Sequence, residues 1–272
     1  GISIRHRGKG RQCFIKTEFA LQRHQQQGGE IHALLLEEPE NHLSHVSMKR
    51  LVNQLATERQ TQGFIATHSS HISSRLDLRK AILLGATRPV LMNELSAETA
   101  AFFMKAPDNN VLEFALARRV LLVEGDAEFI LIEAFYHRLY GRAPEDDGVH
   151  IIAIGGTSFR RYLELARLLE NRVAALRDND GNYQQNCDER YADVLCSRSR
   201  VFADHDNSRS TFEICLYQDN ADLCDALFRG TRRTLTVQDY MLANKAEAAF
   251  QLLQLHAEKL TVPDYIQEAL AW

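Results

Sequence analysis

The 272-residue sequence predicts a mixed α/β fold with a parallel sheet, followed by a helical segment towards the C-terminus. Short apolar runs end abruptly in charged residues and glycine, which is typical of strands buried on both faces of a parallel sheet. Amphipathic helical patterns separate these runs, so strands and helices alternate along the chain. From residue 218 onwards the apolar spacing is helical.

The clearest strand candidate is the apolar run at residues 120–123, which ends at Glu124 and Gly125. A helical pattern follows at once and carries Glu128 in its first turn, where the helix dipole favours an acid. In open α/β sheets ligands bind at the carboxyl ends of the strands, so we expect Glu124 and Glu128 to face one crevice. Each alone would also suit an ordinary turn or surface acid.

A second acidic pair, Asp178 and Asp180, follows the apolar run at residues 173–176. Because side chains two apart in a strand share a face, we expect this pair to project together from the strand end. A strand at 150–154 and a helix at 162–169 lie between the two acidic segments. Four carboxylates would then meet, and each close pair costs roughly 1 to 4 kcal/mol. Such a cluster predicts a bound Mg²⁺, Mn²⁺ or Ca²⁺ ion, which prefers oxygen ligands.

Glu-Gly after one strand and Asp-x-Asp-Gly after a later one resemble the Toprim domain of topoisomerases, primases and some nucleases, over residues 118–217. With the N-terminal third, the chain resembles an OLD (overcoming lysogenization defect) family nuclease, in which an ABC-type ATPase is joined to a Toprim nuclease. The resemblance implies Mg²⁺- or Mn²⁺-dependent cleavage of DNA. It implies two ions about 3.5 to 4 Å apart, with four ligands: Glu124, Glu128, Asp178 and Asp180.

Two more residues are candidates for this site. Glu213 follows the polar stretch 204–208 and would reach the metal ions, although a surface acid is an equal alternative. Lys245 resembles a lysine in the C-terminal helical part of OLD nucleases, which helps to stabilise phosphate charge. A solvated lysine is the alternative. Asn244, just before it, would be a good N-cap for the following helix.

Residues 1–88 resemble the rear half of an ABC-type ATPase. One apolar strand ends at Glu37 and Glu38, and a second strand ends at Thr67-His68-Ser69. The resemblance implies that Glu37 faces Mg²⁺, Glu38 orients the attacking water and His68 contacts the γ-phosphate. Glu37 departs from the aspartate usual at its position.

A glycine-rich turn, Gly8-Lys9-Gly10, precedes a helical pattern at the place of an ABC signature motif, and free N–H groups at a helix start can bind phosphate. The sequence contains no G-x-x-x-x-G-K-[ST] motif, so we do not expect this chain to hydrolyse ATP alone. Because the first residue is glycine and no Met start is present, we interpret the chain as a fragment of a longer, ATP-binding protein.

The predicted organisation is a half ATPase at 1–88, a helical connector at 89–117, the Toprim domain at 118–217 and a helical segment at 218–272, with a polar loop at 182–193. The resemblance implies DNA as substrate, a homodimer through the ATPase part and a helicase or other defence partner. It implies a role in phage defence or DNA repair. The five cysteines are odd in number and lack a CxxC pair, which favours reduced thiols in a cytoplasmic protein. The longest apolar runs are too short to span a membrane, and the net charge of −4 excludes a uniformly basic nucleic-acid binder.

Three other functions remain open. A Toprim unit also serves topoisomerases and primases, although a topoisomerase needs a nucleophilic tyrosine in a partner domain. A non-catalytic, ATP-gated DNA clamp of the SMC kind would use the acids structurally. A pseudo-nuclease would only mediate dimer or partner contacts.

Overall fold

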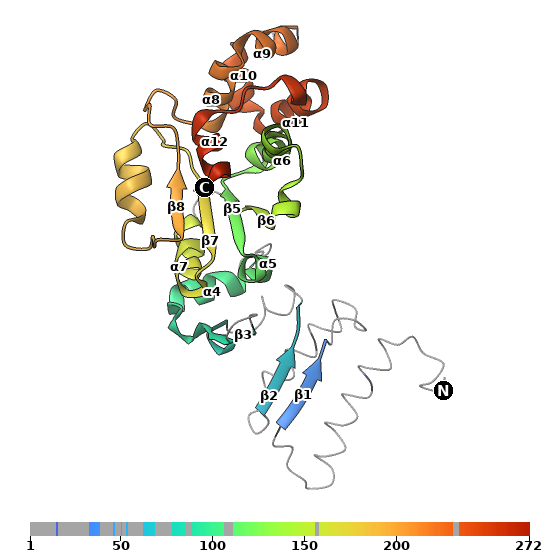
Figure 1. Ribbon diagram of the computed structural model, residues 1–272, viewed down its shortest axis with the longest axis vertical. Helices are drawn as coiled ribbons and strands as arrows, with labels where there is room; N and C mark the ends of the chain where they lie inside the picture. Colours follow the sequence, from blue (N-terminus) through green and yellow to red (C-terminus); the bar gives the residue numbers. More distant parts are fainter. Residues whose placement is uncertain are drawn as a thin grey trace, which may run out of the picture. The chain divides into compact units, whose positions relative to one another are not determined.

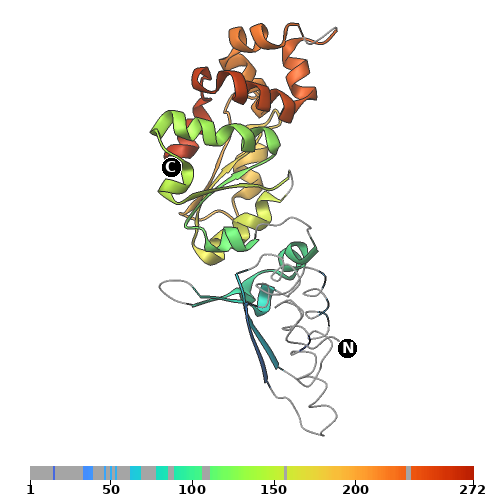
Figure 2. The ribbon, with the colours of Figure 1, turned by 90° about the vertical axis from the view of Figure 1, so that its right-hand side faces the viewer.

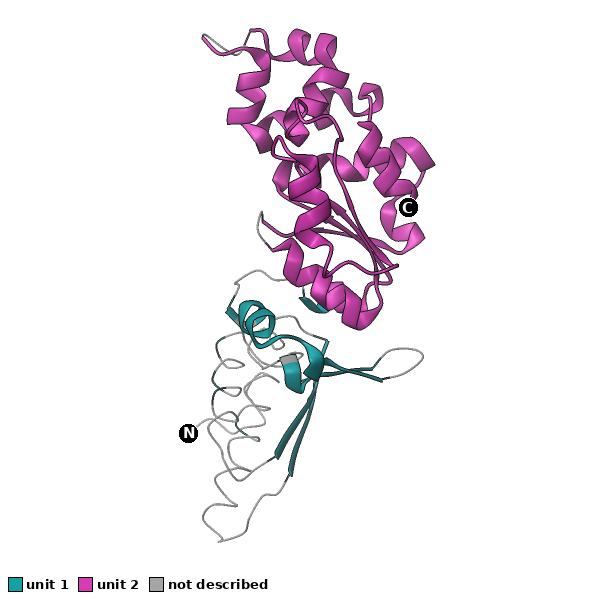
Figure 3. Cartoon of the chain, turned by 90° about the vertical axis from the view of Figure 1, so that its left-hand side faces the viewer, with its two compact units in different colours: residues 1–112 teal, residues 113–272 magenta. Residues whose placement is uncertain are grey.

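The computed structural model (Figure 1, Figure 2) describes residues 33–38, 62–68, 78–84, 89–105, 111–155, 158–230 and 234–272, with the single residues 15, 46, 50 and 53. The chain divides into two compact units, Gly1–Leu112 and Glu113–Trp272 (Figure 3). The division falls within helix α5 (Val111–Leu116). The candidate Toprim segment lies wholly in the second unit.

The first unit contains two parallel strands, β1 (Ala33–Glu37) and β2 (Gln62–Ala66), as the sequence predicts. Glu37 is paired with Ala66, and the Glu38 N–H donates to the Ala66 carbonyl at 2.8 Å. Parallel partners end at the same edge of a sheet, so the acids after β1 and the Thr-His after β2 lie at one edge.

An antiparallel pair follows in the first unit, β3 (Ile82–Leu84) with β4 (Pro89–Leu91). Short 3₁₀ turns at Leu78–Lys80 and Met92–Glu94 flank this pair, and helix α4 (Ala97–Lys105) comes next. The predicted helical connector therefore begins with a strand. Pro89, which cannot join a helical hydrogen-bond ladder, is tolerated at the start of a strand.

The second unit is built on a four-stranded parallel sheet in the order β6-β5-β7-β8, which confirms the predicted α/β class. Three strands coincide with the predicted apolar runs to within a residue or two at each end: β5 (Arg119–Val123), β6 (Val149–Ala153) and β7 (Arg172–Leu176). The fourth strand is β8 (Ser199–Phe202). The middle strands, β5 and β7, are buried along most of their length, as their uninterrupted apolar sequences require.

Helices cover both faces of this sheet. Strands β6 and β7 lie on opposite sides of β5, so right-handed crossovers place α6 (Asp126–Tyr140) and α7 (Phe159–Leu169) on opposite faces. Alternate strand residues follow this division, since Leu121 and Val123 join the core that contains α6 and the C-terminal helices. Figure 2 shows the sheet between its helical layers.

The C-terminal part of the second unit is helical, as predicted: α8 (Phe212–Asp219), α9 (Ala221–Phe228), α10 (Val237–Ala243), α11 (Lys245–His256) and α12 (Asp264–Ala271). Short 3₁₀ turns occur at Pro144–Asp147 and Ala257–Lys259. Across the described residues, no helix combines the length and apolar character needed to cross a bilayer.

The predicted loop at 182–193 is not irregular. It contains a π-helical turn, Gln184–Asp188, and a 3₁₀ turn, Glu189–Tyr191. Two residues of this otherwise polar segment, Cys187 and Tyr191, are buried. Burial of these two side chains explains why the segment is helical.

Replacing Phe135, which is fully buried on the inner face of α6, by alanine should lower the free energy of unfolding by about 3–5 kcal/mol through the cavity it leaves. The same change at Phe129, 49% exposed on the same helix, should stay within about 1 kcal/mol. Urea unfolding followed by fluorescence of the single tryptophan, Trp272, measures both. Equal losses in the two variants would contradict this packing.

Candidate metal centre

The first two acids of the site, Glu124 and Glu128, follow strand β5 in the chain. Glu124 follows its last residue, and the extended Gly125 (φ −148°) begins α6, so the chain turns from strand to helix within two residues. Glu128 therefore lies in the first turn of α6, as predicted, and is only 7% exposed. A carboxyl group buried to this degree is either protonated or has a cation nearby.

Asp178 follows β7, the direct neighbour of β5 in the sheet. The Asp178 N–H donates to the Glu124 carboxylate, and the Phe212 N–H donates to Asp178 Oδ1 at 2.8 Å. Glu124 and Asp178 thus face one another, which is the arrangement that a shared metal site needs.

Asp180 does not project from a strand, contrary to the two-residue periodicity expected from the sequence. Strand β7 ends at Leu176, and Asp180 adopts a left-handed conformation (φ 50°) before Gly181 (φ 79°). The Asn179 side chain accepts the Gly181 N–H at 2.7 Å and closes this tight turn. Asp180 nevertheless lies close enough to Glu124 to raise the pKa of that carboxyl.

The C-terminal helices contribute Glu213 and Lys245. Glu213 occupies the first turn of α8 and is 3% exposed, so it is not a surface acid. Lys245 begins α11, and its Nζ lies 3.0 Å from Glu213 Oε2. Asn244 is the N-cap residue of α11, as predicted, but its side chain does not cap the helix and its amide donates instead to the Tyr240 carbonyl within α10.

The acids raise one another's pKa. Burial, then repulsion from Glu128, Glu124 and Glu213, raises the pKa of Asp178 to about 8. Burial, then repulsion from Glu213 and Glu124, raises the pKa of Glu128 to about 7. Burial also raises the pKa of Glu124, although Arg177 opposes this. Burial acts to lower the pKa of Lys245, but its bond to Glu213 and the nearby acids raise it overall.

Arg177 is a member of the site that the sequence analysis did not identify. Its guanidinium lies 3.3 Å from Glu124 Oε2 and 3.0 Å from Asp180 Oδ2, and the side chain is 7% exposed. Its position directly before Asp178 was the available signal, but a single arginine beside an acid does not indicate which carboxylates it contacts.

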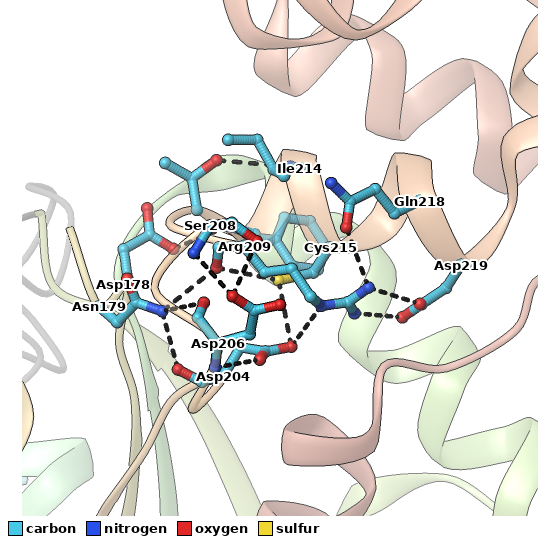
Figure 4. A network of polar contacts seen from close by, with 12 residues as sticks. Asp178, Asn179, Asp204, Asp206, Ser208, Arg209, Ile214, Cys215, Gln218 and Asp219 are labelled. Atoms are coloured by element: carbon cyan, nitrogen blue, oxygen red, sulfur yellow. Dashed lines mark hydrogen bonds and ion pairs between the residues drawn. The ribbon is translucent and has the colours of Figure 1, made fainter. Parts of the chain in front are cut away.

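A polar network holds the acidic turn against the loop after β8 (Figure 4). The buried Asn179 amide donates to the carbonyls of Asp204 at 2.8 Å, Asp206 at 3.0 Å and Arg209 at 3.3 Å. Arg209 in turn forms a two-bond pair with Asp219 at the end of α8 (2.9 and 2.8 Å) and contacts Asp204 at 2.6 Å. The network fixes α8, and with it Glu213, relative to the turn that carries Asp178 and Asp180.

The donor set fits a divalent ion with oxygen ligands. Glu128, Asp178 and Glu213 come together from three segments and present carboxylate oxygens, the preferred ligands of Mg²⁺, Mn²⁺ and Ca²⁺. Among the described residues, no three acidic, histidine or cysteine side chains converge closely enough to form a coordination shell as they stand. Arg177 and Lys245 instead engage three of the five acids.

The first unit holds the candidate ATP-site residues. His68 Nδ1 lies 3.5 Å from Glu38 Oε1, and both side chains are exposed at the edge where β1 and β2 end. Glu37, the last residue of β1, is also exposed. Gly8, Lys9 and Gly10 lie outside the described residues.

A parallel α/β sheet with one acid after a central strand and an acidic pair after its neighbour is the arrangement expected of a Toprim-type domain. Residues 116–180 match the family model described as overcoming lysogenization defect protein-like, TOPRIM domain. These residues are thus an OLD-like Toprim domain, which confirms the family resemblance drawn from the two acidic motifs.

Endonuclease GajA of Bacillus cereus (strain VD045) is 33% identical over 134 residues, a stretch that covers 47% of this chain and 23% of the relative. The chain therefore matches about a quarter of that protein's length. The C-terminal regions of two OLD proteins are similar solved structures: Xanthomonas campestris pv. campestris (20% identity, TM-score 0.42, covering 57% of this chain and 93% of that one) and Burkholderia pseudomallei (18%, 0.39, 57% and 96%).

The metal-free protein should become less stable as the pH rises from about 5 to about 8. The folded pKa of Asp178 and Glu128 lies above the usual carboxyl value, so the native state holds extra protons that it loses over this range. Each group contributes up to about 1.4 kcal/mol per pH unit. Urea unfolding in chelator at several pH values measures the slope, which Asp178→Asn should flatten. An unchanged slope in that variant would refute the assignment.

Proposed function

We propose that the second unit is a divalent-metal-dependent DNA endonuclease that hydrolyses phosphodiester bonds. The observation that carries the proposal is the gathering of five carboxylates and one lysine from four separate segments at the carboxyl ends of β5 and β7. A Toprim match and a relative named as an endonuclease support the same reaction. DNA is the substrate class that this resemblance favours.

The ligands in this proposal are Glu124, Glu128, Asp178, Asp180 and Glu213, with two divalent ions, Mg²⁺ or Mn²⁺, as the metal content. When bound, such ions lower the pKa of a coordinated water and stabilise the leaving oxygen. The chain's own acids hold those ions, and their raised pKa values mean that they bind metal more readily at alkaline pH.

Lys245 acts on the phosphate in this proposal. Its ammonium is half-exposed, lies beside Glu213 and stays protonated because its pKa is raised. Held at the start of α11, it can neutralise charge that develops on a phosphate oxygen. It does so from outside the ligand set, so its loss should reduce catalysis without removing metal.

The proposal for the whole protein is that this nuclease is coupled to an ABC-type ATPase, to which Glu37, Glu38 and His68 belong. ATP would bind the complete protein, which would dimerise through its ATPase part and act in phage defence or DNA repair, with a helicase or another defence protein as partner. The closeness of Glu38 and His68 at one sheet edge supports this assignment.

Supercoiled plasmid should be nicked in Mn²⁺ or Mg²⁺ and left intact in chelator, and Asp178→Ala should reduce nicking by at least about a hundredfold because a ligand is lost. Glu133→Ala, an exposed acid on α6, is the control and should cleave normally. Relaxed closed circles in place of nicks would indicate a topoisomerase, and intact plasmid in every condition would favour the non-catalytic clamp or pseudo-nuclease.

Lys245→Met should lower the cleavage rate by about 10²- to 10³-fold, as loss of a charge-stabilising group does elsewhere. Mn²⁺ binding by calorimetry should be retained, because the lysine is not a ligand. Lys259→Met, an exposed lysine beyond α11, provides the control. A variant that loses metal and activity together would show that Lys245 acts through Glu213 and not on the substrate.

A further inference from the structure

Arg177 divides the acidic cluster into two parts. Its guanidinium bridges Glu124 and Asp180, at 3.3 and 3.0 Å. The remaining acids, Glu128, Asp178 and Glu213, have Lys245 as their nearby cation, through the 3.0 Å contact with Glu213. One part therefore contains a fixed cation between two carboxylates, whereas the other contains two buried acids, Glu128 and Glu213, with exposed fractions of 7% and 3%.

Buried side chains on the side of Arg177 away from the two carboxylates hold its guanidinium in place. Its guanidinium carbon lies 5.7 Å from the ring centre of the buried Phe159, and its charge acts on the buried Cys187 and Tyr191. Arginine stays charged at every physiological pH. A side chain that is 7% exposed and packed against these residues cannot move into solvent without opening the sheet face that α7 covers.

The two parts should differ in their affinity for cations. Repulsion between Glu128, Asp178 and Glu213 is relieved when an ion binds, so this part gains electrostatic energy on binding. At Glu124 and Asp180 the guanidinium already supplies that relief, and an ion must compete with two charge-assisted hydrogen bonds. Only half of the Asp180 side chain is buried, so solvent also screens this pair.

We propose that Arg177 occupies the Glu124–Asp180 pair and so makes metal binding sequential, with one divalent ion bound tightly by Glu128, Asp178 and Glu213 and a second bound weakly. The inference rests on the proposed metal centre and deepens it. Arg177 is a positioning residue here: it contacts two ligands and sets the occupancy of the second ion. The rate of a cleavage reaction that needs both ions would then increase with the concentration of free metal.

Titration of the metal-free chain with Mn²⁺ by isothermal calorimetry tests this. The wild type should bind one equivalent tightly and a second at least about tenfold more weakly, and Arg177→Met should tighten the second by about tenfold, because the ion no longer competes with the guanidinium for the two carboxylates. Electron paramagnetic resonance provides a second reading, since two neighbouring Mn²⁺ ions couple magnetically. The coupled signal should appear at a lower Mn²⁺ concentration in Arg177→Met.

The matched control is Arg160→Met. Arg160 also forms an ion pair with a carboxylate, that of Asp193, but on an exposed surface of the same unit. It should leave both equivalents unchanged. If Arg177→Met does not fold, as judged by circular dichroism, Arg177→Lys decides the question: it keeps the charge, cannot bridge both acids, and should tighten the second equivalent by a smaller factor.

Equal affinity of the two equivalents in the wild type would overturn the inference, as would an unchanged or weaker second equivalent in a folded Arg177 variant. Plasmid nicking, measured on the same samples, separates this failure from that of the proposed function. Nicking with equal binding of two ions would leave the nuclease standing without the arginine's role. Sequential binding without nicking in any variant would support the role of Arg177 and contradict the proposed nuclease activity.

Discussion

The parallel pairing of β5 with β7 is the interaction on which the site depends. It places the residues that follow both strands at one edge of the sheet, so Glu124 and Asp178 come close together although they are far apart in the chain. The Asp178 N–H then donates to Glu124, and the Phe212 N–H donates to Asp178. Every other member of the cluster is arranged around this pair.

Carboxylates that lie this close together repel one another, and three features of the structure reduce the repulsion. Arg177 neutralises one side, Lys245 contacts Glu213 on the other, and the protons favoured by the raised pKa values of Glu128 and Asp178 reduce the remaining charge. Protons and divalent ions are interchangeable in this role because both relieve repulsion between carboxylates. A cluster whose stability depends on pH is therefore also one that gains from metal.

The C-terminal helices complete the site from a distance in sequence. Packing of α11 against α6 brings Lys245 towards the helix that carries Glu128, while α8 supplies Glu213. The Asn179 and Arg209 network connects α8 to the acidic turn, so hydrogen bonds join the segment that carries Glu213 to the one that carries Asp178. This support also explains why polar residues with no place in the proposed chemistry, such as Asn179, are buried.

Most strands of the parallel sheet and two of the candidate metal ligands could be predicted from the sequence, because the patterns that indicate them are local. Apolar runs identified three of the four strands of the second unit, and the acids that follow the two central runs identified Glu124 and Asp178, because polarity changes sharply at the ends of buried strands. What the sequence could not give were the contacts between segments. The left-handed turn at Asp180, the helical turns that bury Cys187 and Tyr191, and the bridge made by Arg177 all depend on neighbours brought by the fold. Tertiary structure decided these features because a charged or polar side chain takes its role from what it meets in space, and periodicity along the chain carries no record of that.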